Sequence, residues 1–164
     1  MDDVFIQNAL TYAARQQRQL AERLGFGIHG IIYVAEDKSS GGKTAVKVHR
    51  EREPYERERD VYERLRQIGV TEILGFNVPQ LLRTDDELLI LEMTIVTRPF
   101  VLDFAGAYLD APPRFSEEIW AEWESGKREQ FDAHWRRVKQ VLDALEDWDI
   151  YMVDVSPTNI AFLE

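Results

Sequence analysis

The sequence predicts an α+β protein whose strands and helices occupy different parts of the chain. Short β-branched and aromatic runs, bounded by glycine-rich or acidic turns, fall mainly in the first 100 of the 164 residues. Further along, apolar residues recur every three or four positions, as in an amphipathic helix. Such segregation is typical of α+β folds. We expect an N-terminal helix over 1–23, a strand-rich lobe over 24–96 and a mostly helical lobe over 97–164, with a hinge at residues 94 to 99.

The composition excludes several classes of protein. With 45% apolar and 30% charged residues, the chain is typical of a globular protein, and without cysteine it has neither disulfides nor thiolate metal sites. Its net charge of −10 disfavours a nucleic-acid partner, which needs clustered Lys and Arg. The sequence has no signal-peptide pattern and no apolar run that could span a membrane. We therefore expect a cytoplasmic protein that binds a small molecule or another protein.

Local patterns predict the elements of the first 100 residues. Apolar spacing predicts a helix over 3–23, which the glycines that follow would end. Runs 31–34 and 44–48 flank a turn that contains Gly-Gly and predict an antiparallel hairpin. Residues 50 to 67 predict a charged amphipathic helix with a proline near its start. A second hairpin is expected from the two apolar runs between residues 78 and 93, which flank an acidic turn.

The remaining elements are mostly helical until the last residues. Residues 100 to 110 predict a short helix, followed by an Ala-Pro-Pro break, and residues 116 to 148 predict a helical region. Two short strands, 150–153 and 160–163, flank the sequence DVSPTN, and we expect them to form a terminal hairpin.

A glycine-rich turn followed by a lysine predicts a phosphate site. Gly25, Gly27 and Gly30 lack a Cβ, so a phosphate oxygen can approach their backbone closely. Lys47 follows on the second strand of the first hairpin, where its ammonium could neutralise that phosphate. A lysine in the middle of a strand also commonly points to solvent, and this alternative stays open.

The charged helix offers a partner for this lysine. Glu58 lies beside the apolar stripe of the helix, so its carboxylate could hold the ammonium of Lys47 in place. Glu63 is the alternative partner. A solvated acidic face is the third interpretation, because the helix carries several carboxylates.

The DVSPTN sequence combines two groups that suit phosphoryl transfer. Asp154, held between two short strands, could accept a proton from an attacking hydroxyl. Asn159 could offer its amide oxygen to a divalent cation. An ordinary Asx or Ser-Pro turn is the structural alternative.

Taken in chain order, these pieces have a known arrangement. They are GFGIHGIIYVA, TAVKV, a helix with an acidic residue, a strand ending LLILEM, and YMVDVSPTN. The arrangement resembles the protein-kinase-like fold, including the small-molecule kinases related to aminoglycoside phosphotransferases. The resemblance runs from about Leu24 to Phe162, although residues 100 to 147 share only a helical character with the family and no motif. It implies a small antiparallel N-terminal lobe with a lobe-linking helix, a truncated, mostly helical C-terminal lobe, and ATP with Mg²⁺ between them.

The resemblance also implies roles for individual residues. The three glycines would cover the phosphates, and Lys47, held by Glu58, would contact the α- and β-phosphates. Asp154 would be the catalytic base and Asn159 a metal ligand. Further residues would surround the nucleotide base. Ile32 and Ala45 would pack on adenine, Leu91 would lie at the back of the pocket, and the backbone from Glu92 to Thr94 would bond to the edge of the base.

One part of the family pattern is not found where the resemblance implies it. An Asp-Phe-Gly motif, whose aspartate is the principal magnesium ligand, should follow Asn159, but residues 160 to 164 do not contain it, and Glu164 comes too soon to replace it. Three interpretations follow. We expect a minimal phosphotransferase with a hydroxyl acceptor, or a pseudokinase that acts through a partner, or else a chain that is cut short or whose missing segment is supplied by a second chain. We also expect that the single chain exposes apolar surface around residues 150 to 163, and that a second copy of the chain or another protein covers this surface.

Overall fold

The computed structural model describes residues 2–163 and confirms the α+β class. Its largest sheet has five strands in the order β1-β2-β3-β7-β6, and every neighbouring pair is antiparallel. The strands in that order are Arg18–Phe26, Gly30–Asp37, Lys43–His49, Ile90–Met93 and Leu81–Asp85. Both expected hairpins, β2-β3 and β6-β7, are confirmed.

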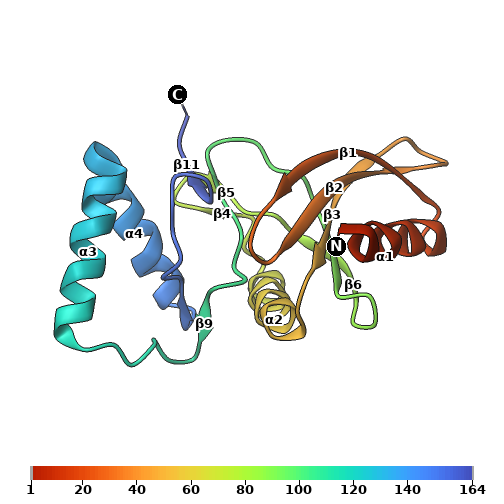
Figure 1. Ribbon diagram of the computed structural model, residues 1–164. Helices are drawn as coiled ribbons and strands as arrows, with labels where there is room; N and C mark the ends of the chain where they lie inside the picture. Colours follow the sequence, from red (N-terminus) through yellow and green to blue (C-terminus); the bar gives the residue numbers. More distant parts are fainter. Residues whose placement is uncertain (1, 164) are drawn as a thin grey trace.

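Two helices pack on opposite faces of this sheet (Figure 1). Helix α1 (Asp2–Arg15) covers the face that carries Val46 and Val48. Helix α2 (Arg52–Ile68), expected from its charged amphipathic pattern, covers the face that carries Ala45 and Leu91. Because successive residues of a strand point to opposite faces, β3 contributes to both cores.

The N-terminal helix is shorter than the expected range of 1–23. It ends at Arg15, Gln17 adopts a left-handed φ of 54°, and Arg18 begins strand β1. The physical reason is tertiary. The guanidinium of Arg18 donates to Glu92, a fully buried residue of β7, and also pairs with Asp37 of β2. The glycine-rich turn therefore joins two strands instead of following a helix.

Residues 100 to 110 form two short strands, and the expectation of a helix there is wrong. Strand β8 (Phe100–Val101) pairs with β11 (Ile160–Ala161), and β9 (Tyr108–Leu109) pairs with β10 (Ile150–Tyr151), both antiparallel. The two strands that flank DVSPTN were expected to pair with each other, but each pairs with a strand of the earlier segment. Two further short strands, β4 (Glu72–Ile73) and β5 (Phe76–Asn77), complete a sheet of order β11-β8-β5-β4.

The expected helical region between residues 116 and 148 is divided in two. Helix α3 (Glu117–Phe131) is followed by a 3₁₀ turn (Asp132–His134) and then by α4 (Trp135–Glu146). The two helices lie beside each other, away from the five-stranded sheet (Figure 1).

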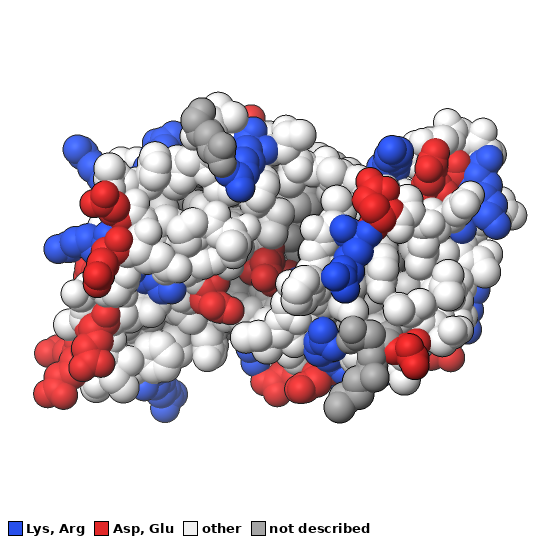
Figure 2. Space-filling view, turned by 45° about the horizontal axis from the view of Figure 1, so that its top comes forward, with Lys and Arg blue, Asp and Glu red and all other residues white. Residues whose placement is uncertain are grey.

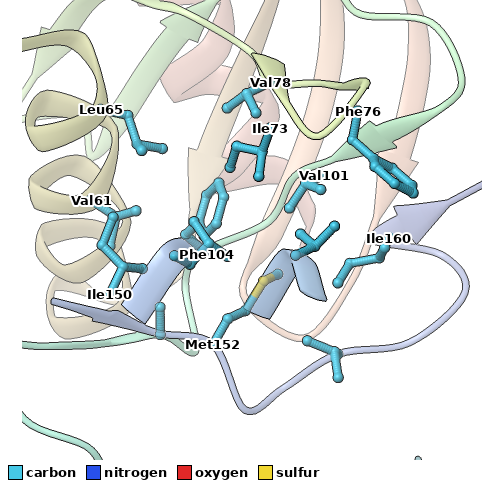
Figure 3. Close-up of a cluster of buried hydrophobic side chains, with 14 of the residues drawn as sticks. Val61, Leu65, Ile73, Phe76, Val78, Val101, Phe104, Ile150, Met152 and Ile160 are labelled. Atoms are coloured by element: carbon cyan, nitrogen blue, oxygen red, sulfur yellow. The ribbon is translucent and has the colours of Figure 1, made fainter. Parts of the chain in front are cut away.

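One apolar core joins α2 to the last strands of the chain. Figure 3 shows side chains from α2, from the short strands and from the last residues converging on it. The expectation of exposed apolar surface near the end of the chain is wrong for most of that segment. Its buried residues are Ile150, Met152, Val155, Ile160 and Ala161. They are covered by the protein's own segments, so this region gives no argument for a partner.

Among residues 2–163, no helix has both the length and the apolar character that crossing a membrane requires.

Candidate functional site

A cavity of about 560 Å³ lies between the five-stranded sheet and the rest of the molecule. Its walls come from the β1-β2 turn, β3, α2, the segment from Met93 to Asp103, and the DVSPTN loop. Figure 2 shows the molecule hollowed between its two halves, with acidic side chains at the hollow. Of the twelve site residues predicted from the sequence, nine line this cavity.

The glycine-rich turn forms one wall, and Gly25, Gly27 and Gly30 all line the cavity. The backbone N–H of Gly27 donates to the carbonyl of Gly30 at 2.9 Å, which closes a tight turn. A Cβ on Gly30 would lie 2.2 Å from the carbonyl oxygen of Val48, so a side chain cannot be accommodated there. Gly25 and Gly27 have nothing within 4 Å of an added Cβ, so their backbone is open to a ligand.

Lys47 does not point to solvent. It is 5% exposed, and its Nζ lies 2.7 Å from Oε1 of Glu58 and 3.1 Å from Oδ1 of Asp103. Burial alone would lower the pKa of this lysine, but the two carboxylates outweigh that effect and the pKa is raised above its usual 10.5. Lys47 is therefore a buried cation held at the cavity wall.

Glu58 is held by three donors and is 1% exposed. Its Oε1 accepts from Lys47 and from Nε2 of His49, both at 2.7 Å, and its Oε2 accepts from the backbone N–H of Phe104 at 2.6 Å. Burial opposes the charge of Glu58, but the neighbouring Lys47 and His49 lower its pKa to about 2. Glu58, and not the alternative Glu63, is the partner of Lys47 in this structure.

Asp103 is the acidic residue at this site that the sequence reasoning missed. It lines the cavity, its side chain is 41% exposed, and it has a left-handed φ of 68°. The next residue, Phe104, is fully buried against Tyr62 of α2, with the ring centroids 5.2 Å apart. This packing, together with the Phe104–Glu58 hydrogen bond, fixes the backbone from which the Asp103 carboxylate projects.

A sequence signal for Asp103 existed. Residues 103 to 106 read Asp-Phe-Ala-Gly, one residue longer than the Asp-Phe-Gly motif that was sought after Asn159. The expectation of a helix over 100–110 concealed this signal. The β8-β11 pairing and a hydrogen bond from the N–H of Leu102 to the carbonyl of Asn159, at 2.9 Å, bring the two segments together.

The DVSPTN loop forms the opposite wall, and both Asp154 and Asn159 line the cavity. The side chain of Asn159 organises the loop: Oδ1 accepts from the N–H of Ser156 at 2.7 Å, and Nδ2 donates to the carbonyl of Asp154 at 2.8 Å. Oδ1 keeps a second lone pair for another partner. A Cβ on Gly106 would lie 3.0 Å from the Cβ of Asp154, so the loop packs closely on the segment that follows Asp103.

At the apolar end of the cavity the structure agrees only in part with the expected residues. Ile32 and Ala45 line the cavity, as does Met93, which faces Ala45 across the β3-β7 pair. Leu91 faces Lys47 in the same pair and lies in the core beside α2 instead of lining the cavity. The residue at the back of the cavity is therefore Met93, two positions further along the strand.

Glu92 and Thr94 likewise do not line the cavity. Glu92 points to the other face of the sheet, where it accepts from Arg18 and Arg83, each at 3.1 Å. The N–H of Thr94 donates to the carbonyl of Gln80, and its hydroxyl accepts from the N–H of Gln80, both at 2.9 Å. Beyond them, Ile95 and Val96 do line the cavity.

No protein-family model matches this chain, and the comparison with curated proteins finds no match. What the site does is therefore inferred from its own residues.

The chemistry of the cavity suits a phosphorylated ligand with a divalent cation. Open glycine backbone and a buried ammonium lie at one wall, and the carboxylates of Asp103 and Asp154 line the same space. Mg²⁺ is commonly bound by one or two carboxylates together with phosphate oxygens and water, so these two side chains could take part in such a site. Within residues 2–163, no group of three or more His, Cys, Asp or Glu is arranged to hold a metal by itself.

Proposed function

We propose that the protein is kinase-like: it binds ATP with Mg²⁺ in this cavity and transfers the γ-phosphoryl group to a hydroxyl acceptor. The observation that carries the proposal is the position of Lys47. Its ammonium lies beneath an open glycine turn, between a buried glutamate from a helix and an aspartate on the facing segment. A buried, fixed cation beside glycine backbone that a ligand can approach closely is suited to phosphate oxygens.

The base of the nucleotide fits the apolar end of the cavity. Ile32 and Ala45 from the sheet and Met93 from β7 would pack against its faces. The N–H of Thr94 is already used by Gln80, so the edge of the base is left to the neighbouring backbone groups around Ile95 and Val96. This revises the sequence-based expectation, which used Leu91 and Glu92.

Asp103 and Asn159 would hold the metal ion. Both line the cavity, both offer oxygen ligands of the kind that Mg²⁺ prefers, and the Leu102–Asn159 hydrogen bond keeps them close in space. When bound, the ion would neutralise charge on the β- and γ-phosphates. Asp103 thus supplies the aspartate that the sequence analysis did not find after Asn159.

In this proposal the family's segments are joined in a different order. The resemblance implies that the metal-binding aspartate follows the catalytic loop. Asp103 instead precedes the DVSPTN loop by about fifty residues, and helices α3 and α4 lie between Asp103 and that loop in the sequence. The pairings β8-β11 and β9-β10 bring the two segments to the same side of the cavity. A rearranged order accounts for the apparent absence of Asp-Phe-Gly and favours the phosphotransferase over the pseudokinase.

The reaction follows from the positions of these residues. The carboxylate of Asp154 would take the proton from the acceptor hydroxyl as the oxygen attacks the γ-phosphorus. The bond from that phosphorus to the bridging oxygen breaks, and ADP leaves. Lys47 would stabilise the negative charge of the α- and β-phosphates throughout.

The pseudokinase remains the second candidate because of one observation. Ser156 lines the cavity two residues after Asp154, at a position where many protein kinases have lysine and many of the resembled small-molecule kinases have histidine. A protein that binds nucleotide without such a cation would act through conformation and not through transfer.

Thermal unfolding with and without ATP tests the proposal. ATP at 100 times its Kd should stabilise the native state by about 2.7 kcal/mol, which is a rise in Tm of about 5–10 °C. Lys47→Met should abolish the rise, whereas Lys43→Met, at the exposed start of the same strand, should keep it. If Lys47→Met does not fold, Ile95→Asp at the cavity wall serves the same purpose. No rise in the wild type at millimolar ATP would refute both candidate functions.

A further inference from the structure

Helix α3 reaches the backbone of the DVSPTN loop with two side chains. The indole N–H of Trp123 donates to the carbonyl of Val153 at 2.9 Å. One helical turn later, Nζ of Lys127 donates to the carbonyl of Val155 at 2.5 Å. Residues four apart lie on the same face of a helix, so the two donors reach the loop together. The carbonyls that they hold stand immediately before and after Asp154.

The loop depends on side chains for its order. Strand β10 ends at Tyr151 and β11 begins at Ile160, so the residues between them have no partner strand. Asn159 Nδ2 donates to the carbonyl of Asp154, and backbone N–H groups donate to that of Ser156. Each of the four carbonyls from residue 153 to residue 156 therefore accepts a hydrogen bond. Two of these bonds come from α3, and the donors of the others lie in the loop or its flanking strand.

Helix α3 also packs on α4 and the 3₁₀ turn, and its Glu124 pairs with Lys139 of α4 at 3.3 Å. Phe131 alone among its described residues is buried. Trp123 packs edge-on against Trp120 and Trp135 with ring centroids 5.7 and 6.0 Å apart, so its ring is fixed while its N–H points to the loop. Neither Trp123 nor Lys127 is among the residues that line the cavity.

We infer that Trp123 and Lys127 are positioning residues that hold the backbone on both sides of Asp154 and so set where its carboxylate points. The inference rests on the proposed function for its consequence in catalysis, because Asp154 is the base in that proposal. Neither residue would contact the nucleotide or the acceptor. Loss of either donor should therefore slow transfer without weakening ATP binding.

Four variants separate this role from simple packing. Lys127→Met and Trp123→Phe remove the donor but keep much of the apolar side chain. Lys127→Arg restores a donor and should rescue. Arg128→Met is the matched control, because Arg128 is 67% exposed on the same helix and pairs only with Glu124 among the ion pairs found.

Amide hydrogen exchange of a peptide covering residues 152–160 reports the loop directly. Each donor-deleting variant should exchange at least about tenfold faster in this peptide, with unchanged exchange in the five-stranded sheet. Steady-state hydrolysis of Mg·ATP, with water as acceptor, should show kcat lowered about ten- to a hundredfold and KM for ATP within about twofold. Lys127→Arg and Arg128→Met should match the wild type in both measurements.

The outcomes are distinguishable from failure of the proposed function. Unchanged exchange in the loop of Lys127→Met and Trp123→Phe would overturn the positioning role, whatever the enzyme does. An increase in KM for ATP with kcat unchanged would also overturn the positioning role, because it would show that Trp123 and Lys127 contribute to ATP binding and not to the transfer step. If the wild type neither binds nor hydrolyses ATP, the proposed function fails, and hydrogen exchange on the free protein still decides whether α3 holds the loop.

Discussion

Replacing Glu58 with glutamine should destabilise the protein by about 3–5 kcal/mol, the usual cost of removing one partner of a buried ion pair. Glu58 is 1% exposed and accepts from Lys47, His49 and Phe104 at 2.6–2.7 Å. Glutamine keeps the shape but has one acceptor oxygen and no charge. Lys47 would be left with Asp103 alone, whose side chain is 41% exposed.

Urea unfolding followed by far-UV circular dichroism measures this cost, with a common m-value as the check for two-state behaviour. At about 2–4 °C per kcal/mol for a chain of this size, Tm should fall by about 6–20 °C. Glu53→Gln is the matched control on the same helix, because its carboxylate is 81% exposed where it pairs with Arg57. That exposed pair should contribute no more than about 1 kcal/mol. Equal costs for the two substitutions would refute the reasoning.

The pH dependence of this difference follows from the lowered pKa of Glu58. A carboxylate with a usual pKa of 4.5 and a folded-state pKa of about 2 stabilises the native state fully above pH 4.5, and that stabilisation is lost as the pH falls towards 2. The gap in unfolding free energy between the wild type and Glu58→Gln should therefore stay constant from neutral pH to about 5. Below that it should narrow, and a gap that widens on acidification would contradict the assignment.

Three glycine substitutions give further expectations. Gly30→Ala should cost about 1–3 kcal/mol in urea unfolding, because its Cβ would meet the Val48 carbonyl at 2.2 Å, whereas Gly27→Ala faces open space and should change stability by less than about 0.5 kcal/mol. Equal losses of stability for Gly30→Ala and Gly27→Ala would argue against the close packing of Gly30 on the Val48 carbonyl. Gly106→Ala places a Cβ 3.0 Å from the Cβ of Asp154, so it should displace the loop and lower the turnover of ATP while ATP affinity persists. Unchanged turnover would show that Gly106 does not constrain Asp154.

The elements predicted correctly are those whose patterns are local. Helix α2 and the β2-β3 and β6-β7 hairpins carry their periodicity and turn residues within a few positions. Strand β1 was not predicted because most of its residues are exposed and the strand lacks an apolar alternation. Its position at the edge of the sheet also depends on a hydrogen bond from Arg18 to Glu92, which is distant in the sequence. Strands β8 and β9 have two residues each and depend on pairing with distant segments: β8 pairs with β5 and β11, and β9 pairs with β10.

The same distinction applies to the candidate site. Lys47, Glu58, Asp154 and Asn159 line the cavity, and residue type and flanking pattern identify them locally. At the apolar end Ile32 and Ala45 line it as well, whereas Leu91, Glu92 and Thr94 do not. Alternation along a strand determines which face a residue occupies but not how far along the strand the cavity extends. Asp103 was missed for a topological reason, since sequence order gave no cause to look for it before the helices.

The Mg²⁺ dependence of ATP affinity in Asp103→Asn tests the central claim most directly. Isothermal titration with ATP, with and without MgCl₂, should show that Mg²⁺ tightens binding to the wild type. In Asp103→Asn the difference between the two affinities should become much smaller, while thermal unfolding without ligand stays close to the wild type, because Lys47 keeps its 2.7 Å contact with Glu58. If Mg²⁺ tightens ATP binding to Asp103→Asn as much as to the wild type, Asp103 does not hold the metal and the rearranged site proposed for this protein is wrong.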